Sequence, residues 1–185
     1  MANILVPLAQ GCEELEAVTI TDLLTRAGFN VVTAGLDDQP VAAGRGMVLV
    51  PKMNLDQAMQ MSFDLIVLPG GLPGADHLND DPRIHHLLQQ MQADGKYIAA
   101  ICAAPKVLAR AGLLQGKQAT SFPGSIPAAD MVGIDYREQA VVVDDRIVTS
   151  RGPGTAMDFA LTLIELLAGK AKREEVERPL QRPAA

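Results

Sequence analysis

The stretch Tyr97-Ile98-Ala99-Ala100-Ile101-Cys102-Ala103-Ala104-Pro105 decides the fold, because it is typical of a buried strand that turns abruptly into a helix. A nucleophile at such a junction stands on a sharp turn, and the backbone N–H groups of the first helical turn point toward it. The turn tolerates only small residues two positions before and after the nucleophile, as Ala100 and Ala104 are. Pro105 suits the start of the helix, where its missing N–H costs nothing. The pattern therefore predicts an elbow at Cys102.

Two interpretations of Cys102 follow from this pattern. In the first, the helix dipole and the backbone amides lower the pKa of the thiol below its free value of about 8.5, so that thiolate is available near neutral pH. In the second, Cys102 is a small buried core residue, since free cysteine is among the most buried residue types. The rest of the chain has to decide between them.

The composition favours a single domain with an aliphatic core. Hydrophobic residues make up 48% of the 185 positions, aromatic residues make up 3%, and there is no tryptophan. Such a core suits a parallel sheet covered by helices. The net charge of −6 argues against direct binding to nucleic acid or to anionic membranes.

The sequence also sets an expectation for location. No apolar run reaches the roughly 18 residues that a membrane helix needs, and the residues before the first expected strand do not resemble a signal peptide. The two cysteines, Cys12 and Cys102, are too few for a disulfide framework and, without nearby histidines, for a zinc site. We therefore expect a cytoplasmic protein.

Apolar runs typical of buried strands alternate with segments of helical periodicity along the chain. The expected strands are 4–9, 29–36, 40–42, 47–50, 64–69, 97–101, 117–121, 140–143 and 146–150. The expected helices are 13–27, 55–61, 81–94, 104–111, 155–168 and 173–177. This alternation predicts an α/β fold, a three-layer sandwich with a mostly parallel central sheet.

Sites in open α/β sheets form beyond the carboxyl ends of the strands, and three loops qualify here. They are 10–16, 70–75 and 102–103. Gly70-Gly71 in the second loop lets backbone N–H groups approach a ligand without a Cβ in the way, as an oxyanion hole requires. An ordinary glycine-rich turn at the end of a strand is the alternative.

One acidic residue of the first loop is expected to reach the thiol. A protonated carboxyl there would donate to the thiolate and lower its pKa, whereas an ionised carboxyl would oppose thiolate formation. The pattern does not choose between Glu13, Glu14 and Glu16, and each could instead be a solvated charge at a helix N-terminus. Among the histidines, His77 is the one candidate for a remote acid or base, because it follows the glycine loop.

Four ordered motifs, spread over nearly the whole chain, resemble the DJ-1/PfpI family. They are Gly11-Cys12-Glu13-Glu14-Leu15-Glu16-Ala17, Leu68-Pro69-Gly70-Gly71, Ala99-Ala100-Ile101-Cys102-Ala103-Ala104-Pro105 and Thr149-Ser150-Arg151-Gly152-Pro153-Gly154-Thr155. The resemblance implies a flavodoxin-like, glutamine amidotransferase-like sandwich with a nucleophile-elbow cysteine, in one domain over 1–185.

The resemblance also implies roles for single residues. Cys102 matches the reactive cysteine of the family and Glu16 its partner carboxyl, while Gly71 and Ala103 match the backbone donors of the oxyanion hole. Both Cys102 and Glu16 are thus expected to be catalytic.

Substrate contacts are expected at Gly70, Arg26 and Arg45. The two arginines look like those that line an anion site at the homodimer boundary of similar proteins, although each could be a plain surface residue. In one respect this chain departs from the pattern. Related proteins commonly carry a histidine in the loop that here contains Phe122, which we expect to face the Cys102 pocket, and a Cys-His-Asp protease triad is therefore disfavoured.

The family implies a homodimer that acts on small reactive dicarbonyls with no metal and no organic cofactor. The expected activity is that of a cysteine-dependent glyoxalase, which converts methylglyoxal to lactate without glutathione, or of a deglycase, which removes early methylglyoxal adducts from proteins and nucleotides. The alternative is a redox sensor or stress chaperone that acts through oxidation of Cys102. A reactive thiol serves both, so the sequence does not separate them.

Overall fold

A seven-stranded sheet forms the centre of the protein in this computed structural model, which describes residues 1–182. Its strands are β1 (Asn3–Leu8), β2 (Asn30–Gly35), β5 (Met53–Asn54), β6 (Leu65–Leu68), β7 (Tyr97–Ile101), β10 (Val141–Asp144) and β11 (Ile147–Ser150). They lie in the order β10-β11-β7-β6-β1-β2-β5, and every neighbouring pair is parallel except β10 and β11. The prediction of a mostly parallel sheet is confirmed.

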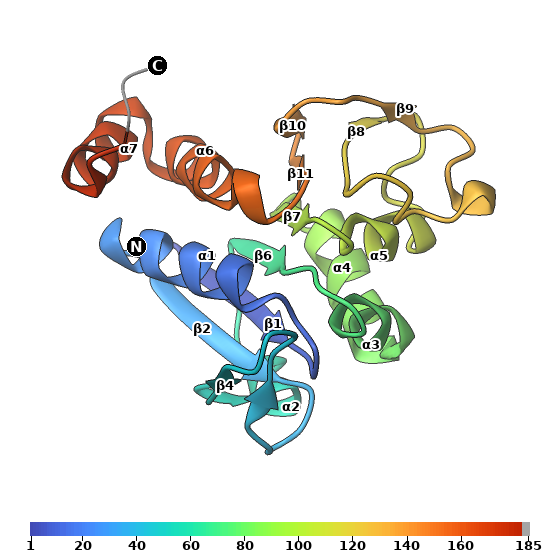
Figure 1. Ribbon diagram of the computed structural model, residues 1–185, viewed down its shortest axis with the longest axis horizontal. Coiled ribbons are helices and arrows are strands. Elements are labelled where there is room, and N and C mark those ends of the chain that lie inside the picture. The colour runs from blue at the N-terminus through green and yellow to red at the C-terminus, as the bar shows by residue number, and fades with distance from the viewer. Residues whose placement is uncertain (183–185) are drawn as a thin grey trace.

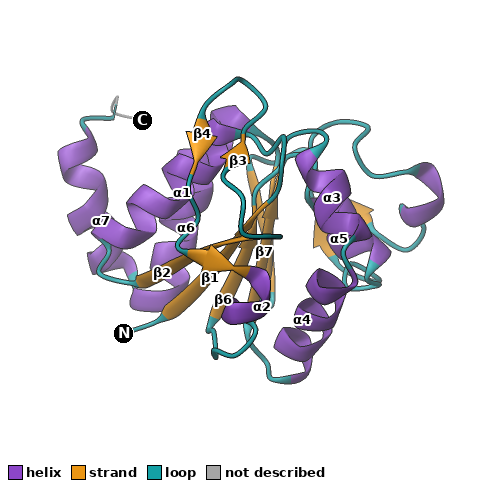
Figure 2. Cartoon of the chain, turned by 90° about the horizontal axis from the view of Figure 1, so that it is seen from below, coloured by secondary structure: helices purple, strands orange, loops and turns teal. Residues whose placement is uncertain are grey.

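Helices cover both faces of this sheet, which gives three layers (Figures 1 and 2). One face carries α1 (Glu14–Arg26), α6 (Ala156–Ala168) and α7 (Lys170–Glu177), and the other carries α2 (Leu55–Ala58), α3 (Gly74–Asp80), α4 (Pro82–Ala93) and α5 (Pro105–Arg110). Two small sheets lie outside these layers, one of β3 (Val41–Ala42) with β4 (Val48–Leu49) and one of β8 (Gln118–Ala119) with β9 (Asp135–Tyr136). Within residues 1–182, no helix has the length and apolar character needed to cross a membrane.

Successive residues of the central strands enter different cores. In β1, Ile4 and Val6 pack toward α1 and α6, while Leu5 packs toward the opposite helices. In β6, Val67 packs toward α1 and α6, while Leu68 packs toward the opposite helices. Both faces of a strand are therefore buried, which explains why these strands appear in the sequence as continuous apolar runs.

Most of the predicted elements are confirmed to within three residues. The strand expected over 97–101 coincides with β7, and both expected hairpins form, as β3–β4 and β10–β11. The loop expected over 70–75 is shorter, because α3 already begins at Gly74. The strand expected over 117–121 is reduced to the two residues of β8, outside the central sheet.

The order of the strands reverses at β1, since β2 lies on one side of it and β6 on the other. In α/β sheets of this kind, sites form at the carboxyl edge near such a reversal. The loops that follow β1, β6, β7 and β11 meet there, which brings segments from four parts of the chain together.

Candidate active site

Cys102 stands at the predicted elbow, directly after β7. Its φ of 64° lies in the left-handed region, which is uncommon for a residue with a side chain and persists only where the surroundings fix it. The Cys102 N–H donates to the Ser150 carbonyl at 2.9 Å, and the Phe122 N–H donates to the Cys102 carbonyl at 2.8 Å. The turn is thus held between the end of β11 and the Phe122 loop, and Cys102 is only 8% exposed.

Two backbone donors face the sulfur. The N–H groups of Gly71 and Ala103 both hydrogen-bond toward Cys102 and favour its thiolate form. Gly70 is tightly enclosed beside them, because a Cβ at this position would lie 2.6 Å from the Cys102 Cβ and 2.9 Å from the Ala103 nitrogen. The structure therefore brings together Cys102 and all three backbone positions that the sequence pointed to.

Glu16 is the one of the three candidate carboxyls that reaches Cys102. It is completely buried, and its Oε2 accepts a hydrogen bond from the Gly70 N–H at 2.8 Å. Its buried Oε1 has no hydrogen-bond partner among residues 1–182. The carboxyl nevertheless lies close enough to the Cys102 thiol for each group to shift the pKa of the other. Glu13 instead lines the pocket above Cys102, and Glu14 binds the β3–β4 turn.

Burial raises the pKa of both members of this pair. Loss of solvation raises the pKa of Glu16 to about 7. Loss of solvation and the Glu16 carboxylate together raise the pKa of Cys102 to about 12, because these effects outweigh the two backbone donors. The expected low thiol pKa is therefore wrong for the resting site. Between the two pKa values the pair holds one proton, and thiolate arises when that proton moves to Glu16.

A pocket of about 410 Å³ opens above the sulfur. Most of its wall is glycine or apolar, and its charged residues are Glu13 and Arg45. The apolar side chains that line it are Leu72, Ala103, Phe122, Pro123 and Pro153. The expectation that the Phe122 loop faces Cys102 is confirmed.

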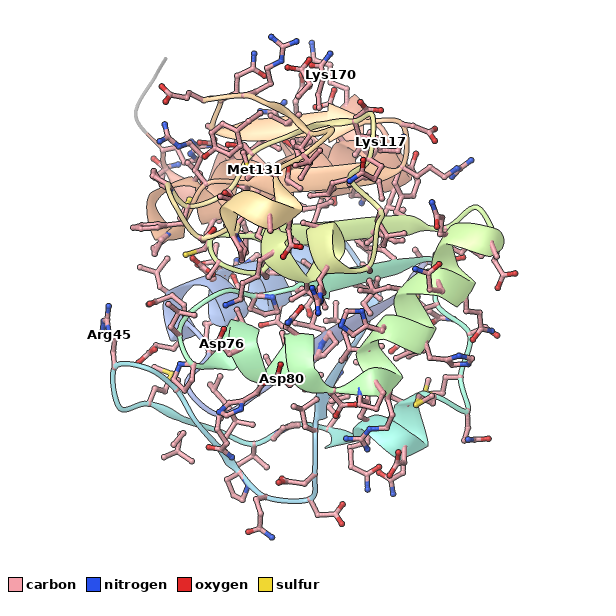
Figure 3. The ribbon with its side chains drawn as sticks, turned by 90° about the vertical axis from the view of Figure 1, so that its right-hand side faces the viewer. Arg45, Asp76, Asp80, Lys117, Met131 and Lys170 are labelled. Carbon is pink, nitrogen blue, oxygen red and sulfur yellow. The ribbon has the colours of Figure 1, made fainter. Side chains whose placement is uncertain are left out.

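Arg45 reaches this pocket from the turn between β3 and β4, where Figure 3 shows its side chain extending away from the ribbon. The turn is fixed to the site by two contacts. The Arg45 N–H donates to the Glu14 carboxylate at 2.9 Å, and the Gly44 N–H donates to the Cys12 carbonyl at 2.8 Å. The turn that carries Arg45 is therefore braced against the site.

Arg26 is not brought to the pocket by its own chain. It lies in the last turn of α1, where it forms an ion pair with Asp22 at 2.6 Å. Arg26 follows Glu16 by ten positions, which correspond to about 15 Å along the helix. Its expected role at a homodimer boundary stays a prediction.

His77 and Cys12 lie outside the Cys102 pocket. His77 lines a different cavity, of about 370 Å³, together with Asp37 and Asp80. Cys12 is 1% exposed, and burial raises its pKa to about 11. In the described part of the chain, no group of three or more histidine, cysteine or acidic side chains is placed to hold a metal ion.

Sequence reasoning assigned no role to Ser150 or Gly152, although both lie in the fourth motif. Ser150 accepts the backbone N–H of the elbow, and a Cβ on Gly152 would lie 4.0 Å from the Cys102 sulfur. The signal was the position of this motif at the end of a strand, where a loop of the site was to be expected.

Comparison with known proteins agrees with this geometry. The family profile described as DJ-1/PfpI family matches residues 2–166. "Protein dj-1beta" of Drosophila melanogaster is 42% identical over 177 residues, which cover 95% of this chain and 95% of that protein. The Caenorhabditis elegans protein named "Glutathione-independent glyoxalase DJR-1.2" is 36% identical over 179 residues, which cover 97% of this chain and 95% of that protein.

Solved structures show the same likeness. The crystal structure of Drosophila melanogaster DJ-1beta matches with a TM-score of 0.93 at 40% sequence identity, over 99% of each chain. The flavodoxin-like, glutamine amidotransferase-like fold that the four motifs implied is therefore confirmed. With its elbow cysteine in place and its sequence matched over nearly its whole length, this chain belongs to the DJ-1/PfpI family.

Proposed function

We propose that this protein is a cysteine-dependent glyoxalase that converts methylglyoxal and related 2-oxoaldehydes to 2-hydroxy acids without glutathione, in defence against carbonyl stress. The observation that carries the proposal is the buried pair of Cys102 and Glu16 beside two backbone N–H donors. The name of the Caenorhabditis elegans relative supports it.

The first step adds Cys102 to the aldehyde. The thiol proton moves to Glu16, the sulfur forms a bond with the aldehyde carbon, and the π electrons of the carbonyl move to its oxygen. The N–H groups of Gly71 and Ala103 stabilise the resulting oxyanion, which then takes the proton from Glu16 to give a hemithioacetal. Glu16 is left as a carboxylate, ready to act as a base.

The second step moves hydrogen between neighbouring carbons. The Glu16 carboxylate removes the proton from the hemithioacetal carbon to give an enediolate, and Glu16 returns this proton to the former ketone carbon. The hydroxyl proton of the hemithioacetal passes to the neighbouring oxygen, so that a thioester carbonyl and a 2-hydroxyl group form. The product is a thioester of the 2-hydroxy acid. Water then attacks the thioester, the carbon–sulfur bond breaks, and the sulfur regains its proton. One carbon is oxidised and its neighbour reduced, so the balance requires only water.

The activity is tested by following lactate during incubation of the purified protein with methylglyoxal. We expect Cys102→Ala to reduce lactate formation to the rate in buffer, because no nucleophile is left in the pocket. Cys12→Ala is the matched control and should keep the wild-type rate, since Cys12 does not line the pocket.

Lactate formation at the buffer rate in the wild type would contradict the glyoxalase. Two other proposals use the same thiol, and each has its own measurement. Release of lysine from an early methylglyoxal adduct tests a deglycase. The mass added at Cys102 by graded peroxide tests a redox sensor or stress chaperone.

We also propose a homodimer in which α1 and the β3–β4 hairpin meet a second copy. Five apolar side chains between 42% and 78% exposed lie on these elements or next to them, and they are Leu15, Val18, Met47, Val48 and Val50. Arg26 follows Leu15 and Val18 at helical spacing, so it extends the same stripe along α1. A cytoplasmic location and a single domain over 1–185, of which 183–185 lie outside the described residues, complete the proposal.

Sedimentation equilibrium tests the dimer. We expect a particle of twice the 19.6 kDa chain mass at micromolar concentration. Val18→Asp should shift the protein toward monomer, because it places a charge in the stripe, whereas Val132→Asp, at an exposed position outside these elements, should not. A wild-type particle of 19.6 kDa at every concentration would contradict the proposal.

A further inference from the structure

Phe122 forms one wall of the Cys102 pocket, and its backbone is tied to the nucleophile. Its N–H donates to the Cys102 carbonyl at 2.8 Å, and its own carbonyl accepts from the Ser125 N–H at 3.0 Å. The Ser125 hydroxyl donates to the Cys102 carbonyl at 3.3 Å. Although its backbone is fixed, Phe122 remains 51% exposed. Its ring therefore offers apolar surface at a fixed place relative to the sulfur.

Gly152 lies close to both this ring and the sulfur. A Cβ on Gly152 would lie 3.5 Å from the Phe122 Cδ2 and 4.0 Å from the Cys102 Sγ, which are ordinary contact distances. The space beside Gly152 therefore has room for about a methyl group. A larger substituent bound at the sulfur must lie in the pocket, on the side of the Phe122 ring that lines it.

The part of the pocket wall next to Phe122 is apolar. Leu72, Pro123 and Pro153 continue the apolar wall beyond Phe122. The two charged residues, Glu13 and Arg45, have opposite signs, so together they do not favour either charge. An apolar group attached next to the reacting carbon therefore loses no polar contact on entering, and it gains contact with a ring.

We infer that the Phe122 wall of the Cys102 pocket is a subsite for the substituent on the ketone carbon, and that it selects 2-oxoaldehydes with an aromatic or bulky apolar substituent. The inference rests on the proposed function. When the sulfur adds to the aldehyde carbon, the adjacent ketone carbon lies one bond further along, and its substituent lies in the pocket against the ring of Phe122.

The turnover test compares phenylglyoxal, which yields mandelate, with methylglyoxal, which yields lactate. We expect kcat/KM to be about tenfold higher for phenylglyoxal, as one aromatic contact provides. Phe122→Ala should lower the ratio of the two kcat/KM values about tenfold because the ring is lost. Val132→Ala, outside the pocket, is the control and should leave the ratio unchanged.

A second measurement does not depend on turnover. Alkylation of Cys102 by 2-bromoacetophenone or by bromoacetone forms a sulfur–carbon bond and releases bromide, and its rate is followed by intact mass. The aromatic reagent should be favoured in the wild type, and Phe122→Ala should reduce that preference. If neither glyoxal is turned over, the proposed function fails while the alkylation ratio still tests the subsite. Ratios unchanged by Phe122→Ala, in a variant that keeps the wild-type Tm, would overturn the inference.

Discussion

Glu16→Gln is expected to lower kcat with methylglyoxal by a factor on the order of 10² to 10⁴, which is the usual contribution of a positioned acid or base. The amide oxygen of glutamine still accepts the Gly70 N–H that now binds Glu16 Oε2 at 2.8 Å, so the loop keeps its place. The amide does not take a proton from sulfur or from carbon. The variant therefore removes proton transfer but keeps the packing of the site. An unchanged Tm checks the packing, and kcat is then compared with that of the wild type.

Glu13→Gln is the matched control, because Glu13 directly precedes α1, three residues before Glu16, and lines the Cys102 pocket without perturbing the thiol. We expect its kcat to fall by less than about tenfold. An equal loss in both variants would mean that charge in the pocket, rather than a base at Glu16, supports turnover.

The pH profile follows from the same carboxyl. Burial raises the pKa of Glu16 to about 7, and the base must be ionised to accept a proton, so kcat should rise as the pH increases through 7. In Glu16→Gln the remaining activity should lose this rise. A wild-type profile without a transition near pH 7 would contradict the assignment of Glu16 as the base.

Ionisation of Glu16, which should raise kcat, should lower the stability of the folded protein. The folded state holds the Glu16 proton up to a pKa of about 7, whereas the unfolded state loses it near the ordinary value of 4.5. This contribution is complete below pH 4.5 and is lost as the pH rises through 7, a decrease on the order of 3 kcal/mol. Urea unfolding at several pH values should show this decrease in the wild type, and Glu16→Gln should remove it.

The elbow could be predicted because its signals are local. Nine residues hold all of them: an apolar strand, alanine two positions before and after Cys102, and proline at the start of the next helix. The φ of 64° at Cys102 depends on those neighbours. The pKa of the thiol could not be predicted in the same way. It depends on burial, and the pocket around the sulfur is lined by six segments far apart in the chain.

The choice of Glu16 had a signal in the sequence that was not used. Glu16 precedes Ile20 by four residues and Leu23 by seven, and both of these are buried in the core beneath α1. That spacing places Glu16 on the apolar face of the helix, where a carboxyl is not solvated, whereas Glu14 turns toward the hairpin. Helix α3 had no comparable signal, because it begins at a glycine and buries only Ala75 and Leu78 beyond it.

Gly70→Ala is expected to destabilise the protein by about 1–3 kcal/mol, the usual range for an overpacked core, and to lower lactate formation on the order of 100-fold. The added Cβ would lie 2.6 Å from the Cys102 Cβ, 2.8 Å from the Ile101 oxygen and 2.9 Å from the Ala103 nitrogen. Two of these three atoms are backbone, so no side chain can rotate away to make room.

Relief of this overlap requires the Gly70 loop and the elbow to separate. Separation withdraws the Gly70 N–H from Glu16 and moves the Gly71 N–H away from the sulfur, so the base and the oxyanion donors lose their positions together. At a temperature well below Tm, the loss of activity should therefore be larger than the unfolded fraction of the protein can explain. Urea unfolding and lactate formation measure the two effects separately.

Gly154→Ala is the control for this substitution. Gly154 lies in the loop after β11, next to Pro153 of the pocket wall, and a Cβ there would meet nothing within 4 Å. Its stability should stay within about 0.5 kcal/mol of the wild type, as for most surface changes. If Gly70→Ala matched this control in both stability and turnover, the close contact between the Gly70 loop and the elbow would not exist in solution. The pairing of Glu16 with Cys102 would then lose its structural support, because Gly70 is the residue that touches both.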